Sequence, residues 1–170
     1  RACGFKVSRH EGKITGLAAH GNYKKYEDCF DKLVEVKNGK VYVSLAEKLL
    51  FNSGSTKVDS KGEGALKQLA NALKGNNDIN IMVEGHTDNV PISGTGKFND
   101  NWDLSVIRAT SIVRILVNNG VLNEVITASG RGEFSPVAEN TTTENKALNR
   151  RTEIILTPKL DKLFQLLETY

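Results

Sequence analysis

The hydrophobic positions of the chain change their period several times, which predicts strands that alternate with helices. Segments that alternate apolar and polar side chains, or are rich in β-branched residues, are typical of strands. Segments with apolar residues three and four positions apart are typical of helices. The predicted strands are 40–45, 79–84, 125–129 and 151–156, with 34–37 as a hairpin partner of the first. The predicted helices are 65–73, 101–118 and one or two turns within 144–149.

Turn and capping residues support these boundaries. Asn38 and Gly39 form a turn signal between the first two strands, and either Asp59 or Ser60 is a suitable cap for the first helix. Glycines after the two longer helices, at positions 75 and 120, are stop signals. A parallel crossover needs about a dozen residues or more, which the alternation of strands and helices supplies. The pattern therefore predicts an α/β sandwich of βαβαβ type, a mixed β-sheet with helices packed on one face.

The two ends of the chain carry weaker signals than its middle. Residues 1–22 show no sustained period and are predicted to be an irregular lead-in. We expect a main domain over 36–157, preceded by a lead-in with a short amphipathic helix over 1–35 and followed by a C-terminal helix over 158–170. Such apolar stripes usually pack on a core, although a role in homodimer formation stays open. The two stripes are Tyr23, Tyr26, Phe30, Leu33 and Val34, and Leu160, Leu163, Phe164 and Leu167.

Composition and charge exclude some classes of function. The chain is 39% hydrophobic and 25% charged, and no apolar run approaches the roughly 20 residues that cross a bilayer. Its net charge of +3 comes from interspersed signs, so a nucleic-acid partner is not expected. Cys3 and Cys29 fit no zinc or redox motif, and their pairing depends on the compartment. Because the chain begins at Arg1 without a signal sequence, we expect any membrane anchor to lie outside it.

The candidate chemistry lies in the loop after strand 79–84 and in the helix that follows. Asn101 and Arg108 are seven positions apart, so they share one face of the helix, and the loop can bring Asp88 back beside its first turns. An aspartate accepts a free ammonium group, and an arginine gives a carboxylate two parallel hydrogen bonds. The pattern predicts a receptor for a zwitterion, such as the side-chain end of meso-diaminopimelate.

Several motifs in the same order resemble the OmpA C-terminal-like domains, a family that includes Pal lipoproteins and the flagellar stator protein MotB. The resemblance covers most of the main domain, and several spaced elements in order are far more specific than one tetrapeptide. The motifs are Gly85-His86-Thr87-Asp88, Asn101-x-x-Leu104-Ser105-x-x-Arg108-Ala109, Gly130-x-Gly132 and Asn149-Arg150-Arg151.

This resemblance implies non-covalent binding of peptidoglycan through the diaminopimelate of its stem peptide, with no catalysis and no cofactor. It places the ligand on Asp88 and Arg108, and it puts further residues in the same pocket. One arginine of the Arg150 and Arg151 pair is expected to approach the ligand or brace the Asp88 loop, and we favour Arg151. The resemblance also implies a periplasmic domain of a Gram-negative cell. We expect its parent protein to be anchored in the outer membrane, and an anchor in the inner membrane stays open. The further pocket residues are Thr87, Asn101 and Leu104.

One departure from the family pattern concerns the rim of this pocket. The stretch between Asp88 and Asn101 is longer than in Pal-like members. With its Val90-Pro91 segment it resembles the MotB-like and Bacteroidetes-type versions. We therefore expect a pocket rim of a different shape.

Two other functions compete with this prediction. A cell-wall hydrolase or amidase needs a zinc triad or a nucleophile with a base, which the scattered His10, His20 and His86 do not supply. His86 and Asp88 form only a His-x-Asp pair without further ligands at suitable spacing, so we expect no metal. The third possibility is a dimerisation module built on the terminal stripes. Trp102 is expected to lie in the core or over the helix start rather than to stack on a sugar.

Overall fold

The structure, a computed structural model, describes residues 4–10, 13–20, 34–52, 54–92 and 98–159. The sheet and its helices run from residue 34 to residue 158. Of residues 4–10 and 13–20 only the backbone is described. The predicted stripes that begin at Tyr23 and Leu160 lie outside the described residues, apart from Val34, and so do Cys3 and Cys29.

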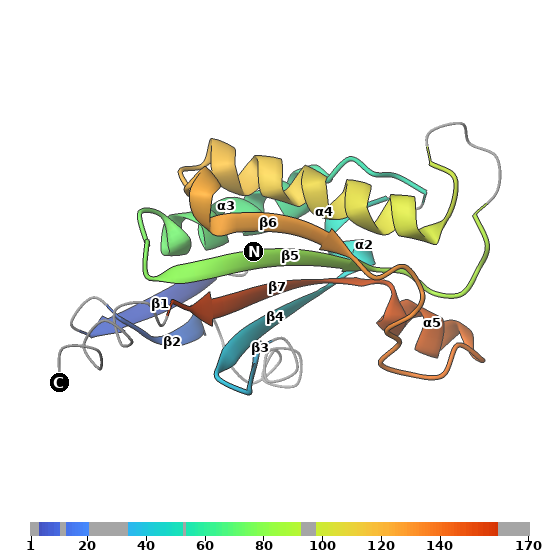
Figure 1. Ribbon diagram of the computed structural model, residues 1–170, viewed down its shortest axis with the longest axis horizontal. Helices are drawn as coiled ribbons and strands as arrows, with labels where there is room; N and C mark the ends of the chain where they lie inside the picture. Colours follow the sequence, from blue (N-terminus) through green and yellow to red (C-terminus); the bar gives the residue numbers. More distant parts are fainter. Residues whose placement is uncertain (1–3, 11–12, 21–33, 53, 93–97, 160–170) are drawn as a thin grey trace, which may run out of the picture.

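The centre of the fold is a five-stranded mixed sheet with the order β3-β4-β7-β5-β6 (Figure 1). Only β5 and β6 are parallel, and the other neighbours are antiparallel. All the strands predicted in this part of the chain are confirmed, with shifts of a few residues at their ends. The strands are β3 (Val34–Lys37), β4 (Lys40–Ala46), β5 (Ile79–His86), β6 (Ile126–Gly130) and β7 (Arg151–Pro158).

Two long helices lie side by side on one face of the sheet (Figure 1). They are α3 (Ser60–Leu73) and α4 (Asn101–Asn118), and each begins after an aspartate whose side chain accepts a backbone N–H of the first turn. Asp59 is the cap of α3. This arrangement confirms the predicted α/β sandwich. Shorter helical segments are α2 (Glu47–Leu50), η2 (Asn123–Val125) and α5 (Thr143–Asn149).

The hydrophobic core fills the space between the sheet and the two long helices. Side chains alternate across a strand, so every second residue of β4, β5 and β7 faces the helices. Leu66 of α3, Ile112 of α4 and Ile154 of β7 are completely buried in this layer. The remaining residues of these strands point to the opposite face of the sheet. Neither long helix covers that face, and we call it the open face (Figure 1). That face carries several of the charged side chains described below.

The turn between β3 and β4 has the conformation that its sequence predicts. Asn38 and Gly39 both have positive φ angles, 52° and 72°. Two successive residues in this region form the two-residue hairpin turn for which Asn-Gly is favoured. The turn fixes the register in which Lys37 pairs with Lys40. The hairpin prediction is confirmed.

An N-terminal hairpin and two short helical segments, α2 and η2, were not predicted from the sequence. The irregular lead-in instead contains an antiparallel hairpin of β1 (Gly4–His10) and β2 (Lys13–His20). Its register shifts between Ser8 and Arg9, which interrupts the period of two that reveals a strand. Helix α2 was missed because four residues are too short to show a helical period. In the part of the chain that the structure describes, no helix is long and apolar enough to cross a membrane.

Candidate functional site

The strand pairing brings three charged residues from distant parts of the chain to one end of the sheet, where β4 and β5 end and β7 begins. Arg151, the first residue of β7, lies opposite Ala46 at the end of β4 and opposite His86 at the end of β5. Glu47 therefore follows β4, Asp88 follows β5 and Arg150 precedes β7 at the same edge. The first turns of α4 pass over this edge and add Arg108.

The four side chains form a row of ion pairs with alternating charge, which we call the charge chain. Its order is Asp88, Arg150, Glu47 and Arg108. Arg150 Nη1 lies 2.5 Å from Asp88 Oδ2, and Arg150 Nε lies 2.8 Å from Glu47 Oε2. The other oxygen of Glu47 pairs with Arg108 Nη2. Asp88 and Arg108, the two predicted ligand residues, are 6% and 5% exposed. They are neighbours in the same cluster but do not pair directly, because Arg150 and Glu47 lie between them.

Arg108 is held on three sides. Its Nε donates a hydrogen bond of 3.1 Å to the carbonyl of Ser55, and its guanidinium carbon lies 5.1 Å from the centre of the Phe51 ring. Burial lowers the pKa of Arg108 below its ordinary value, and the neighbouring carboxylate of Glu47 opposes this effect. An arginine stays charged in proteins despite such shifts. Arg108 is therefore a fixed cation with a carboxylate already bound to it.

The loop that carries Asp88 is fixed by short-range hydrogen bonds. The Thr87 N–H donates to the carbonyl of Gly132 at 2.8 Å, and the Thr87 hydroxyl donates to the carbonyl of Asp88 at 2.9 Å. Asp88 Oδ1 accepts the N–H of Val90 at 3.1 Å, a bond typical of an aspartate in a turn. This leaves Oδ2 for a charged partner. Asp88 is thus both a turn residue and one end of the charge chain.

Asn101 ties this loop to the start of α4. Its amide nitrogen donates to the carbonyls of Asp88 and Val90, each at 3.2 Å, and to Glu133 Oε2 at 2.6 Å. The amide oxygen is buried and has no hydrogen-bond partner among the described residues. One turn further along α4, Leu104 is buried as well. Hydrogen bonds therefore join three of the predicted pocket residues, Thr87, Asp88 and Asn101, in the same loop region.

Two glycines let α4 approach the sheet edge closely enough to form the site. A Cβ atom on Gly85 would lie 2.2 Å from the carbonyl oxygen of Ser105, and one on Gly130 would lie 2.3 Å from the Ser105 hydroxyl. That hydroxyl accepts the N–H of Gly132 at 3.1 Å and donates to the carbonyl of Trp102 at 2.8 Å. This close contact fixes the distance between α4, which carries Asn101 and Arg108, and the ends of the strands. Both glycines, Gly85 and Gly130, belong to motifs noted in the sequence.

The prediction that Arg151 braces the Asp88 loop is corrected, since Arg150 makes this contact. Arg151 instead places its Nε 2.7 Å from Glu153 Oε1 and donates to the carbonyl of Ser135. The physical reason is its position as the first residue of β7, where strand geometry directs its side chain to the open face beside Glu153. Arg150 lies before the strand and is free of that alternation.

The sequence reasoning missed two carboxylates and one amide in this region. Glu47 contacts both arginines of the charge chain, and Glu133 accepts the amide of Asn101. Neither has a sequence signal, because Glu47 is a single glutamate at the start of the short helix α2 and Glu133 is a single glutamate in the loop after β6. Asn149 stood in a noted motif but received no role. It is completely buried and holds the loop after β6.

Replacing Asn149 with alanine is expected to lower the free energy of unfolding by about 2 to 4 kcal/mol. Its oxygen accepts the N–H groups of Val137 and Ala138, and its nitrogen donates to Ala138 and to Asn140 Oδ1. Urea unfolding measures the change, with Asn118→Ala at the exposed end of α4 as the matched control. Equal stabilities of the two variants would contradict this role.

Comparison with known proteins gives relatives over the same region. Motility protein B of Bacillus subtilis is 36% identical over 118 residues, which are 69% of this chain and 45% of that protein. Peptidoglycan-binding protein ArfA of Mycobacterium tuberculosis is 35% identical over 105 residues, 62% of this chain and 30% of that protein. The solved structure of the cell wall anchor of the T6SS from Pseudomonas aeruginosa has a TM-score of 0.68 and 31% identity, covering 78% of this chain and 93% of that one.

The chain spans less than half the length of these two curated relatives. A sequence model of the OmpA family matches residues 50–150, more than half of the chain. The matched span contains Asp88, Arg108 and Arg150, together with the glycines that seat α4 on the sheet. The chain therefore belongs to the OmpA family.

Proposed function

We propose that this domain binds peptidoglycan non-covalently through the diaminopimelate of the stem peptide, and so anchors its parent protein to the cell wall without catalysing a reaction. The observation that carries the proposal is the pair of buried opposite charges, Asp88 and Arg108, each already bound to a group that resembles part of the ligand. The names of two relatives, a peptidoglycan-binding protein and a cell wall anchor, support the same class of ligand.

The charge chain suggests how a zwitterion enters. The ammonium group of the ligand takes the place of the Arg150 guanidinium at Asp88 Oδ2, and its carboxylate takes the place of Glu47 at Arg108. Arg150 and Glu47 are not stranded by this exchange, because they hold each other through a separate contact between Nε and Oε2. The ligand therefore forms one ion pair with Asp88 and one with Arg108, and the ion pair between Arg150 and Glu47 stays intact.

The pocket residues around the Asp88 loop have supporting roles in this proposal. The amide oxygen of Asn101 lacks a partner among the described residues and is the acceptor available to an N–H of the ligand. Thr87 fixes the loop, and Leu104 supports the first turn of α4 from within the protein. Arg150 replaces Arg151 as the arginine that approaches the ligand.

The expected affinity is modest at a single site. Charge-assisted hydrogen bonds contribute roughly 1.5 to 3 kcal/mol each, and part of this is spent on displacing Arg150 and Glu47. A dissociation constant of about millimolar to micromolar follows. Many copies of both partners on a polymer raise the overall retention well above that of one site.

Peptidoglycan lies outside the cytoplasmic membrane, so a domain with this function faces the periplasm or the extracytoplasmic space. The proposed function requires neither a Gram-negative cell nor an anchor in the outer membrane. Relatives occur in Bacillus subtilis and Mycobacterium tuberculosis as well as in Pseudomonas aeruginosa. The zwitterion site requires only a wall with a free diaminopimelate end.

Co-sedimentation with purified cell walls tests the proposal. The chain is expected to be retained on walls with meso-diaminopimelate and to be released by soluble diaminopimelate peptide. On walls with lysine at this position, retention is expected to fall about tenfold or more, because lysine lacks the terminal carboxylate that Arg108 receives. Equal retention on both kinds of wall would contradict recognition of the zwitterion.

A further inference from the structure

The open face of the sheet carries a second cluster of charged side chains, separate from the chain of Asp88, Arg150, Glu47 and Arg108. Glu84 and His86 are two positions apart on β5, so they point to the same face. Glu153 of β7 lies directly opposite Glu84 in the antiparallel pairing. Together these three residues place one ring nitrogen and two carboxylate oxygens within 4.8 Å of one another.

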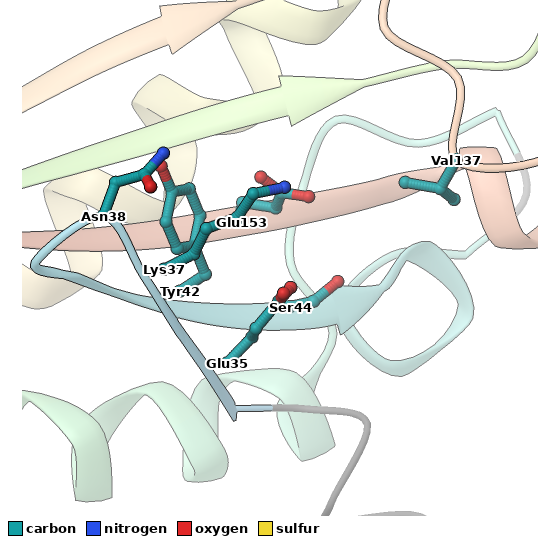
Figure 2. Close-up of a pocket in the computed structure, with 7 residues that line it drawn as sticks. All are labelled: Glu35, Lys37, Asn38, Tyr42, Ser44, Val137 and Glu153. Carbon is teal, nitrogen blue, oxygen red and sulfur yellow. The ribbon is translucent and has the colours of Figure 1, made fainter.

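Figure 2 shows Glu153 projecting from β7 toward the same face as Tyr42 and Ser44 of β4. A shallow pocket of ≈ 250 Å³ on this face has Glu153 in its wall. Of the three residues, Glu153 borders this pocket, whereas Glu84 and His86 are buried. The pocket is lined by Glu35, Lys37, Asn38, Tyr42, Ser44, Val137 and Glu153.

Two carboxylates directly opposite each other in a sheet repel, so their position needs a compensating cation. Two arginines compensate in part. Arg131 Nε lies 3.2 Å from Glu84 Oε2, and Arg151 Nε lies 2.7 Å from Glu153 Oε1. Each arginine occupies one oxygen of its glutamate. The remaining oxygens, Glu84 Oε1 and Glu153 Oε2, lie 3.4 Å and 3.9 Å from His86 Nε2.

His86 is the independent observation that points to a ligand. It is 4% exposed, and neither ring nitrogen has a hydrogen-bond partner among the described residues. Leaving a buried polar group without a partner costs about 1 to 3 kcal/mol, which makes such groups rare in folded proteins. The unpartnered Nε2 lies beside the two carboxylate oxygens that the arginines leave unoccupied. The three atoms surround one position.

We propose that Glu84, His86 and Glu153 bind a divalent transition-metal ion of the Zn²⁺ class on the open face of the sheet. Zinc bonds of 2.0 to 2.2 Å in a tetrahedron separate neighbouring ligand atoms by about 3.4 Å. Glu84 Oε1 and His86 Nε2 are already 3.4 Å apart, and the 3.9 Å between Glu153 Oε2 and His86 Nε2 has to shorten by about half an ångström. Three protein ligands leave one position for water. A mixed nitrogen and oxygen set favours zinc over magnesium or calcium, which prefer oxygen alone.

The surroundings of the cluster suit this role. Arg131 and Arg151 hold the outer oxygens of the two glutamates and fix their orientation, as partners in the second layer of a metal site do. The site escaped the sequence because its third ligand comes from another strand, late in the chain.

A bound ion would join β5 to β7 near the edge of the sheet where β5 ends and β7 begins. His86 is two residues before Asp88, and Glu153 is three residues after Arg150. The ion therefore stabilises the sheet edge from which the peptidoglycan residues project. An ion that binds only the folded state raises the unfolding temperature in proportion to the logarithm of its concentration.

The experiment is a titration of the full chain, first stripped with chelator, with Zn²⁺ by calorimetry in excess Mg²⁺ and reducing agent. One equivalent is expected to bind, with affinity lowered on the order of a hundredfold in His86→Gln and in Glu153→Gln. The double variant His10→Gln/His20→Gln removes the other two histidines of the chain and is expected to bind as the wild type does.

Thermal unfolding of the same proteins provides the second readout. Zn²⁺ is expected to raise the unfolding temperature of the wild type and of the double variant, and to leave Glu153→Gln unchanged. Unaltered Zn²⁺ affinity in both His86→Gln and Glu153→Gln, loss of binding in the double variant, or no binding at all would each overturn the proposal. No peptidoglycan is present, so the outcome is independent of the proposed wall binding.

Discussion

Replacement of Arg108 with alanine is expected to abolish measurable binding of diaminopimelate peptides. The guanidinium supplies the charge-assisted hydrogen bonds to the ligand carboxylate, and the loss of two such bonds corresponds to a hundredfold or more, about 3 kcal/mol. Calorimetric titration measures the loss. Arg114→Ala removes an exposed arginine from the same helix and serves as the matched control, with an affinity within about threefold of the wild type.

Arg108 is buried and paired with Glu47, so its removal also lowers stability. Asp88→Asn separates the two effects, because the variant keeps the size of the side chain and an oxygen for the Val90 N–H. It loses the charge that pairs with the ligand ammonium. The same loss of binding is expected with a folded circular dichroism spectrum. Near-wild-type affinity in both variants would rule out this site.

Replacement of Gly85 with alanine is expected to cause the largest loss of stability, at least about 3 kcal/mol. The new Cβ would lie 2.2 Å from the backbone oxygen of Ser105, which cannot move without displacing α4 from the sheet. Binding is expected to fall too, since α4 carries Arg108. Urea unfolding gives the free energy of unfolding, and binding is then measured below the transition.

Gly64→Ala is the matched control for this change. Gly64 lies inside α3 with no atom within 4 Å of its missing Cβ, so alanine there is expected to stabilise the protein by about 0.5 to 1 kcal/mol. Replacement of glycine by alanine is therefore expected to lower the free energy of unfolding at position 85 and to raise it at position 64. A loss below 1 kcal/mol for Gly85→Ala would mean that the strand and helix adjust freely at their contact.

The fold could be read from the sequence wherever an element is long enough to show its period. The 18 residues of α4 were predicted with their observed bounds, because a stripe of apolar positions and the Gly120 signal fix both ends. The hairpin of β3 and β4 followed from Asn38 and Gly39. The order of the strands in the sheet follows from long-range pairing, which no local pattern contains.

The site could be predicted only where its residues belong to spaced motifs. Asp88, Asn101 and Arg108 were placed together from the loop and the helical spacing, and the structure brings them to one cluster. Glu47 was missed because it reaches the cluster through the register of β4 against β7. Arg151 was wrongly favoured as the arginine that braces the Asp88 loop, because the choice depends on the residue at which β7 begins.

The glutamates of the proposed metal cluster illustrate the same limit. Glu84 and His86 stand two positions apart in a strand, a spacing found in many strands without a metal. Only the pairing of Glu84 with Glu153 shows that two carboxylates and an imidazole converge. The third ligand, Glu153, is found only in the tertiary structure. The metal is proposed because neither ring nitrogen of the buried His86 has a hydrogen-bond partner among the described residues.

The most direct test of wall anchoring through a zwitterion is a calorimetric titration of the chain with two stem peptides. One ends in free meso-diaminopimelate, and the other has the side-chain carboxylate of this residue converted to an amide. We expect saturable binding of the free form at one site, with a dissociation constant of about millimolar to micromolar, and binding of the amide weaker by about tenfold or more. Equal affinities, or no binding of the free form, would contradict the account.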